Sequence, residues 1–160
     1  IDGLGLVLNI AAILLAFVAL IALVNGVIGM VGGWFGITNL SLQSILGYIF
    51  APVAVIIGVP MKESVVAGSL IGQKIILNEF VAFTSLSEIM STLSAKTIAV
   101  VTFSLCGFAN ISSIAILIGG IGGMAPSRKH DIARLGWKAV LGGTLANLLS
   151  ATIAGLLLTI

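Results

Sequence analysis

Glu79 is the residue whose type and setting most clearly suggest chemistry. No charged residue occurs between Asp2 and Lys62, and Glu79 itself lies in the apolar run I-I-L-N-E-F-V-A-F. A carboxylate in such a setting is costly within a membrane unless it faces a cavity, a partner or a ligand. Two interpretations remain open. Glu79 is either a solvated or backbone-bonded residue at a loop tip, or a cavity carboxylate that accepts hydrogen bonds from a ligand or carries a coupling proton.

A second polar cluster contains Asn110, Ser112 and Ser113, which follow a glycine, Gly107, in an apolar stretch. An asparagine amide both donates and accepts hydrogen bonds, and Asn110 and Ser113 share one face if their segment is helical. These side chains suit ligand binding, and they equally suit hydrogen bonding between helices. Phe108, beside them, suits stacking on a planar ligand or packing against lipid or protein.

Other reactive residue types indicate no catalysis. His130 lies in a basic loop without a cluster of ligating residues, so we expect no metal site, and Cys106 lies in an apolar run where cysteine usually packs. Lys74 is available to pair with a carboxylate. The sequence contains no nucleophile, zinc, redox or phosphate-loop motif, and we predict that the protein is not an enzyme.

The composition predicts an integral, multi-pass membrane protein. Hydrophobic residues make up 59% of the 160 residues and charged residues 8%, with a mean hydropathy of +1.30. Soluble domains carry about 25% charged residues. The net charge of +2 is too small to indicate nucleic acid as a partner. Because the chain begins at Ile1 without a methionine, we expect it to be a piece of a longer protein.

Apolar runs and their interruptions predict an all-α fold of transmembrane helices with a re-entrant helical hairpin and one unwound helix. The stretches 60–72 and 78–90 are each too short to span a bilayer, which takes about 20 residues, so we expect a hairpin with its polar tip at 72–74. Basic residues near Arg128 predict a cytoplasmic loop. The expected segments are a long transmembrane helix (1–36), an interfacial helix that returns into the protein near Pro52 (37–59), the re-entrant hairpin (60–93), an interrupted transmembrane helix (94–124), the basic loop (125–131) and a last transmembrane helix (132–160).

The runs N-E-F-V-A-F and C-G-F-A-N, with the closing G-T-L-A-N-L-L-S-A-T-I-A-G, resemble the C-terminal part of the concentrative nucleoside transporters. The resemblance covers essentially the whole chain. It implies a homotrimer in the plasma membrane, which in bacteria is the inner membrane, with lipid around it. It implies a scaffold role for the helix 1–36 and an elevator-like transport domain that contains the hairpin 60–93. It also implies that Glu79 bonds the ribose hydroxyls of a nucleoside, that Asn110 and Ser113 face the ribose, and that Phe108 lines the pocket.

The sequence departs from that family pattern in what it lacks. The family's first hairpin, with a glutamine-threonine-glutamate motif for the base, and the first unwound helix that holds sodium are absent. The coupling ion, sodium or proton, would therefore be held mostly by an N-terminal remainder of the same transporter. The expected function is ion-coupled nucleoside symport, and the alternative is a channel-forming or structural membrane subunit without concentrative transport.

Overall fold

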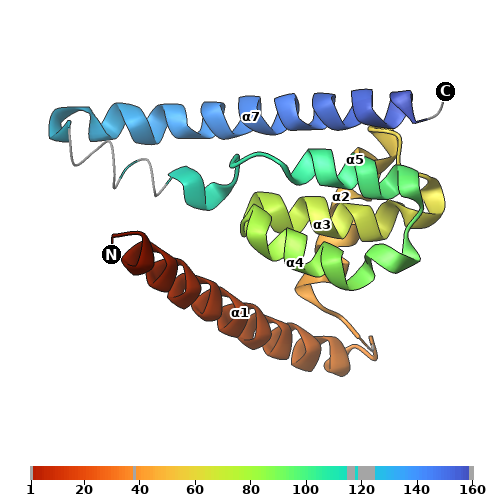
Figure 1. Cartoon of the computed structure of the whole chain (residues 1–160). Coiled ribbons are helices and arrows are strands. Elements are labelled where there is room, and N and C mark those ends of the chain that lie inside the picture. Colours follow the sequence, from red (N-terminus) through yellow and green to blue (C-terminus); the bar gives the residue numbers. More distant parts are fainter. Residues whose placement is uncertain (1, 38, 115–117, 119–124, 159–160) are drawn as a thin grey trace. The chain divides into compact units, whose positions relative to one another are not determined.

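The computed structural model describes residues 2–37, 39–114, 118 and 125–158, and within these the regular structure is helical, with no strand. Short 3-10 turns at Met61–Glu63, Met90–Thr92 and Pro126–Arg128 lie between longer helices. Figure 1 shows the helices in chain order, which are α1 (Asp2–Trp34), α2 (Leu42–Ile56), α3 (Ser64–Ile76), α4 (Glu79–Ile89), α5 (Ala95–Leu105) and α7 (Lys129–Leu157).

The chain divides into two compact units, Ile1–Ile45 and Leu46–Ile160. In the first unit α1 is 33 residues long, about 50 Å at 1.5 Å per residue. Its Asn25 side chain accepts a 2.8 Å hydrogen bond from the backbone N–H of Leu42 and donates a 2.9 Å bond to Gln43. A polar residue in this apolar helix thus fixes the chain that leads into α2.

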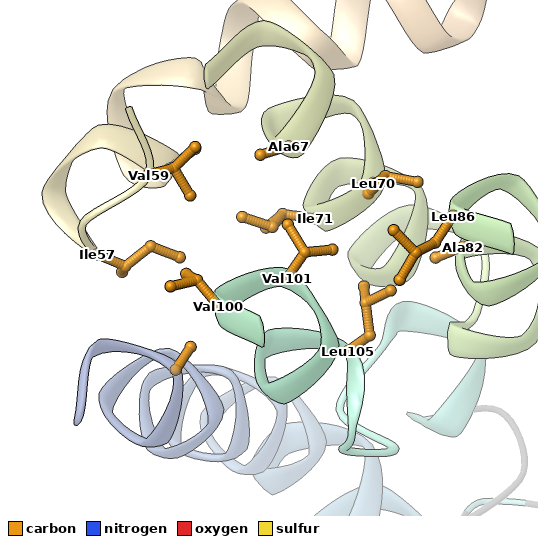
Figure 2. Packing of buried hydrophobic residues seen from close by; sticks show 12 residues of the cluster. Ile57, Val59, Ala67, Leu70, Ile71, Ala82, Leu86, Val100, Val101 and Leu105 are labelled. Atoms are coloured by element: carbon orange, nitrogen blue, oxygen red, sulfur yellow. The ribbon is translucent and has the colours of Figure 1, made fainter. Parts of the chain in front are cut away.

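The second unit has one hydrophobic core, formed by apolar side chains from the end of α2 and from α3, α4, α5 and α7 (Figure 2). Its fully or nearly fully buried members are Ala54, Ile57, Val59, Ala67, Leu70, Ile71, Ala82, Leu86, Val100, Val101, Leu105 and Ala151. Successive members on α3 and on α5 lie three or four residues apart or next to one another, which is the spacing of one helix face. The core therefore holds together the helices that carry the polar clusters.

Glycines let the helices of this unit approach closely. A Cβ atom at Gly68 would lie 2.6 Å from the backbone nitrogen of Ala51, and one at Gly72 would lie 2.8 Å from Phe50. This four-residue spacing of small residues is typical of close helix contacts in membranes. On α7, Gly155 meets the side chain of Val100 on α5, where a Cβ would lie 2.7 Å away.

Three expected boundaries differ from the structure. The helix of the expected interfacial segment does not end at Pro52, because α2 continues through Pro52 to Ile56. An internal proline removes one helix hydrogen bond, and the close glycine contacts with α3 hold α2 in place despite that loss. The hairpin turn lies at Leu77 and Asn78, beyond the expected tip at 72–74, and α7 begins within the expected basic loop, at Lys129.

One described helix, His130–Leu157, is long and apolar enough to cross a membrane. The shorter apolar stretches found within the described residues are Val18–Trp34, Leu42–Ile56 and Ala95–Leu105. With 13 and 11 residues, α3 and α4 are about 20 and 16 Å long, shorter than the roughly 30 Å hydrocarbon core of a bilayer.

Candidate functional site

Two of the breaks between helices in the second unit end at an asparagine that caps the next helix. Asn78 has extended backbone angles, and its side-chain oxygen accepts a 2.9 Å hydrogen bond from the N–H of Val81. This is an N-cap, which satisfies one of the free N–H groups of a helix start. It makes Glu79 the first residue of α4, where the helix dipole favours a negative charge.

The second interruption follows α5 and ends at Asn110. Its side-chain oxygen accepts a 2.8 Å hydrogen bond from the N–H of Ser113, and the helical structure resumes at Ile111. Asn110 is therefore a cap and lies outside the helix, so the condition under which Asn110 and Ser113 would share one helix face is not met. The two residues bond each other at a helix start, because the break places Asn110 outside the helix.

Gly107, within the break, lies close to the side chain of Asn147. A Cβ atom there would lie 1.9 Å from the side-chain nitrogen of Asn147 on α7. That Asn147 nitrogen is buried and has no hydrogen-bond partner among the described residues. Asn147 was not singled out from the sequence, although its position as a polar residue in the apolar last helix was a usable signal.

Asn110 and Glu79 bring the two interruptions together. The side-chain nitrogen of Asn110 donates a 2.8 Å hydrogen bond to Oε2 of Glu79, and Asn110 is only 2% exposed. Oδ1 of Asn110 also accepts a 2.7 Å hydrogen bond from the hydroxyl of Ser112, and the hydroxyl oxygen of Ser113 lies 2.9 Å from it. Because Oδ1 is occupied by donors, the amide can present only its N–H side to Glu79.

Two further polar contacts lie at this junction. The hydroxyl oxygen of Ser112 is 3.3 Å from the carbonyl oxygen of Leu77, at the hairpin turn, as well as 2.7 Å from Asn110, so its one proton serves either acceptor. The hydroxyl of Ser113 donates to the carbonyl of Phe108 within the break. Ser112 was noted in the sequence as a polar residue but not chosen for the site, and its role depends on a contact 35 residues away.

The structure brings three of the four expected site residues together and leaves the fourth apart from them. Glu79, Asn110 and Ser113 are joined through Asn110, whereas Phe108 extends outward with 78% of its surface exposed. Cys106 is also exposed, which corrects the expectation that it packs in the apolar run. Since α5 ends at Leu105, Cys106 no longer lies on the packed face of that helix.

Chemically, the junction offers a carboxylate with one oxygen held and one oxygen available. Oε2 of Glu79 accepts from Asn110, while Oε1 accepts from no donor of the described residues, and Glu79 is partly exposed. An ionised carboxylate accepts hydrogen bonds from hydroxyl or N–H groups. Within the described residues, no group of three or more His, Cys, Asp or Glu side chains is placed to hold a metal ion.

The chain as a whole is similar to one family of known proteins. The model for the C-terminus of Na⁺-dependent nucleoside transporters matches residues 1–155. The chain is 60% identical to transporter YutK of Bacillus subtilis and 51% identical to nucleoside permease NupC of Helicobacter pylori, covering 96% of this chain and 38% of each relative. A solved structure of CNTnw, in an inward-facing substrate-bound state, matches with a TM-score of 0.91 and 55% identity over 95% of this chain and 38% of that one.

Proposed function

Since the chain belongs to the family of Na⁺-dependent, concentrative nucleoside transporters, we propose that it forms the C-terminal part of an ion-coupled nucleoside symporter. The family consists of membrane transporters, and the chain spans about two fifths of the length of the relatives it matches, 38% in each case. The observation that carries the proposal for the site is the bond between Asn110 and Glu79, which joins the hairpin turn to the helix break.

At this junction Glu79 accepts hydrogen bonds from the ribose hydroxyls of a nucleoside. Its Oε1 is the acceptor left available by the protein, and hydrogen bonds to an ionised group are stronger than those between neutral groups. Asn110 has a second N–H that donates to a ligand oxygen, because a side-chain amide carries two. The vicinal hydroxyl groups of a ribose suit an acceptor and a donor placed side by side.

Phe108 and Ser113 complete the proposed pocket. The exposed ring of Phe108 offers a flat apolar surface against the base or the sugar of the nucleoside. The hydroxyl proton of Ser113 is used in the bond to the carbonyl of Phe108, so its oxygen acts toward a ligand as an acceptor. Ser113 also orients Asn110, whose Oδ1 accepts a 2.8 Å hydrogen bond from the backbone N–H of Ser113.

The short helices support a transport domain of the kind in which half-helices meet inside the membrane. We place α3 and α4 as a re-entrant hairpin, because neither is long enough to cross, and the break after α5 as an unwound part of a transmembrane helix. Irregular backbone at membrane depth is tolerated where it lines a cavity. An elevator-like movement of this domain would expose the junction alternately to the two sides of the plasma membrane, the inner membrane in a bacterium.

The coupling ion, sodium or a proton, would bind mostly to residues of the full-length transporter outside this chain. The experiment that tests the function is uptake into proteoliposomes that contain the full-length protein. Nucleoside should accumulate above its external concentration when a sodium or proton gradient is imposed. Uptake that only equilibrates would indicate a channel, and no uptake with either ion would contradict the proposal.

The experiment that tests the site compares a nucleoside with its 2′,3′-dideoxy analogue. Glu79→Gln should weaken nucleoside binding by about tenfold to a hundredfold, because a bond to a charged group contributes roughly 1.5–3 kcal/mol. The analogue should bind the unaltered protein poorly and lose less affinity in the variant. Glu88→Gln, at an exposed position of the same helix, is the matched control and should leave both affinities unchanged.

A further inference from the structure

Lys74 is the most deeply buried charged residue described in the second unit. Its side chain is only 1% exposed, and it lies in the last turn of α3, a short distance before the hairpin turn. Burying an ammonium group away from water is costly unless an opposite charge compensates it. The site as described so far makes no use of this residue.

Glu79 is the acidic group placed to compensate Lys74. Glu79 begins α4, which packs against α3, and it lies five residues after Lys74 across the hairpin turn, although the two side chains form no direct ion pair. The hydrogen bonds found among the described residues involve no atom of the Lys74 side chain, which leaves the charge of Glu79 as its compensation.

No other charged group of the neighbouring helices lies at this end of α3. α2 carries no charged residue, and α5 carries Lys96 in its first turn. Glu63, just before α3, is about 17 Å from Lys74 along the helix axis, at 1.5 Å per residue. Glu88 is about 14 Å from Glu79 along α4.

We propose that Lys74 is a positioning residue for the ligand site, whose buried ammonium balances the charge of the Glu79 carboxylate. Balanced in this way, and with Oε2 held by Asn110, the carboxylate presents its second oxygen to hydroxyl groups of a ligand. Lys74 acts through Glu79, because a side chain that is 1% exposed does not reach a ligand itself. The inference rests on the proposed function, in which Glu79 binds the ribose.

Charge balance and simple packing by Lys74 predict different results. Lys74→Met keeps the long unbranched apolar stem and removes the ammonium group. If Lys74 only fills space, this change has little effect. If Lys74 balances Glu79, the change lowers the affinity for a ribonucleoside, which depends on the Glu79 charge. It has little effect on that affinity once Glu79 is neutral.

The test is calorimetric binding of a ribonucleoside and its 2′,3′-dideoxy analogue to the full-length transporter. The proteins compared are the unaltered transporter, Lys74→Met, Glu79→Gln and the double variant. Lys74→Met should weaken ribonucleoside binding by about tenfold, as expected for a perturbed charge-assisted bond, and should affect the analogue much less. In the Glu79→Gln background the same change should lower ribonucleoside affinity by no more than about twofold, because the effects of coupled residues are not additive.

Gln73→Met is the matched control for damage to the hairpin. Gln73 neighbours Lys74, is 2% exposed and accepts a 2.8 Å hydrogen bond from Ser85 of α4. Its replacement removes a buried polar contact between the two hairpin helices without changing charge. We expect it to weaken binding of the ribonucleoside and of the analogue to the same extent.

Melting temperatures of the same proteins keep the inference testable if Lys74→Met binds nothing or folds poorly. The double variant leaves no unbalanced charge, so it should melt at a higher temperature than Lys74→Met alone. Four results would overturn charge balance. Lys74→Met could weaken binding of both ligands equally, weaken binding as much in the Glu79→Gln background, or leave affinity unchanged. The double variant could also melt no higher than Lys74→Met. An unaltered transporter that binds no nucleoside would instead overturn the proposed function, and the melting temperatures would still test the pair.

Discussion

The amide of Asn110 donates a 2.8 Å hydrogen bond to the carboxylate of Glu79 across 31 residues of sequence. Each of the two residues lies at the start of a helix, Glu79 just after its cap and Asn110 as the cap itself. The carboxylate is thereby held from one side and left available on the other. The predictions below test this junction, the helices that carry it and the orientation of the chain.

Asn110→Asp should weaken nucleoside binding although it preserves the helix cap. An aspartate oxygen can still accept from the N–H of Ser113, but it cannot donate to Glu79 and places a second negative charge beside it. We expect an affinity loss of about tenfold or more for the ribonucleoside. In the double variant with Glu79→Gln, the total loss of binding free energy should be smaller than the sum of the two single losses, since both residues act on one ligand. Strict additivity in calorimetric titrations would contradict the shared site.

Gly107→Ala should destabilise the protein, because the new methyl group would lie 1.9 Å from the side-chain nitrogen of Asn147. Overpacking of this kind costs about 1–3 kcal/mol, and the change should appear as a lower melting temperature of the purified transporter. Gly142→Ala, also a glycine of this unit, meets nothing within 4 Å and is the control. Adding Asn147→Ala to Gly107→Ala should restore part of the loss; if it does not, the contact is not the cause.

Glu63 should make stability depend on acidic pH. It lies in the short turn before α3, outside the helices that we treat as lying in the membrane, and accepts bonds from the N–H and hydroxyl of Ser94 at 3.1 and 2.8 Å. Hydrogen bonds from the side chains of Thr97 and Ser94 hold the pKa of Glu63 below its usual value of 4.5.

A lowered folded-state pKa means that this stabilisation is present above the unfolded-state value of about 4.5 and is lost as the pH falls through the lower folded-state value. Glu63→Gln should therefore melt below the unaltered protein at pH 7, and the difference should shrink in acid below pH 4.5. Glu88→Gln, exposed on α4, is the control and should show no such pH dependence. A difference that stays constant from neutral to acidic pH would contradict the role of the ionised group.

The segment from Arg128 to Lys138 should lie in the cytoplasm. Positively charged residues concentrate on that side of membrane proteins, and this segment holds the chain's densest group of them. Ser127 is exposed, so Ser127→Cys in a Cys106→Ala background should react with an impermeant thiol reagent only from the inside of sealed vesicles. Labelling from the outside would reverse the proposed orientation, and the Cys106→Ala protein alone gives the background signal.

The full-length transporter should assemble as a homotrimer through α1. This helix is 33 residues long, and large apolar side chains such as Leu4, Leu8 and Leu15 are exposed on it. Such a helix buries its surface against lipid or against other copies of the chain. Native mass measurement in mild detergent should give three copies, and finding monomers alone across a range of detergents would contradict the assembly.

The sequence by itself determined the helical class and several local features of the site. Apolar composition and run lengths predicted an all-helical membrane protein, and α1 and α7 lie close to where those runs occur. The family resemblance is confirmed by the match to residues 1–155. The helix break near Gly107 was also visible, because glycine followed by asparagine and serine disfavours a continuing helix.

Only the tertiary structure decided which polar groups meet. Sequence spacing placed Asn110 and Ser113 on one face only if their segment is helical, whereas the structure makes Asn110 a cap that also binds Glu79. The sequence likewise placed Lys74 at the hairpin tip, while the structure buries it in α3. Apolar runs depend on neighbours within a few residues, so a sequence reveals them. Contacts across 31 residues depend on how α3, α4 and α5 pack around a common core, which no local pattern specifies.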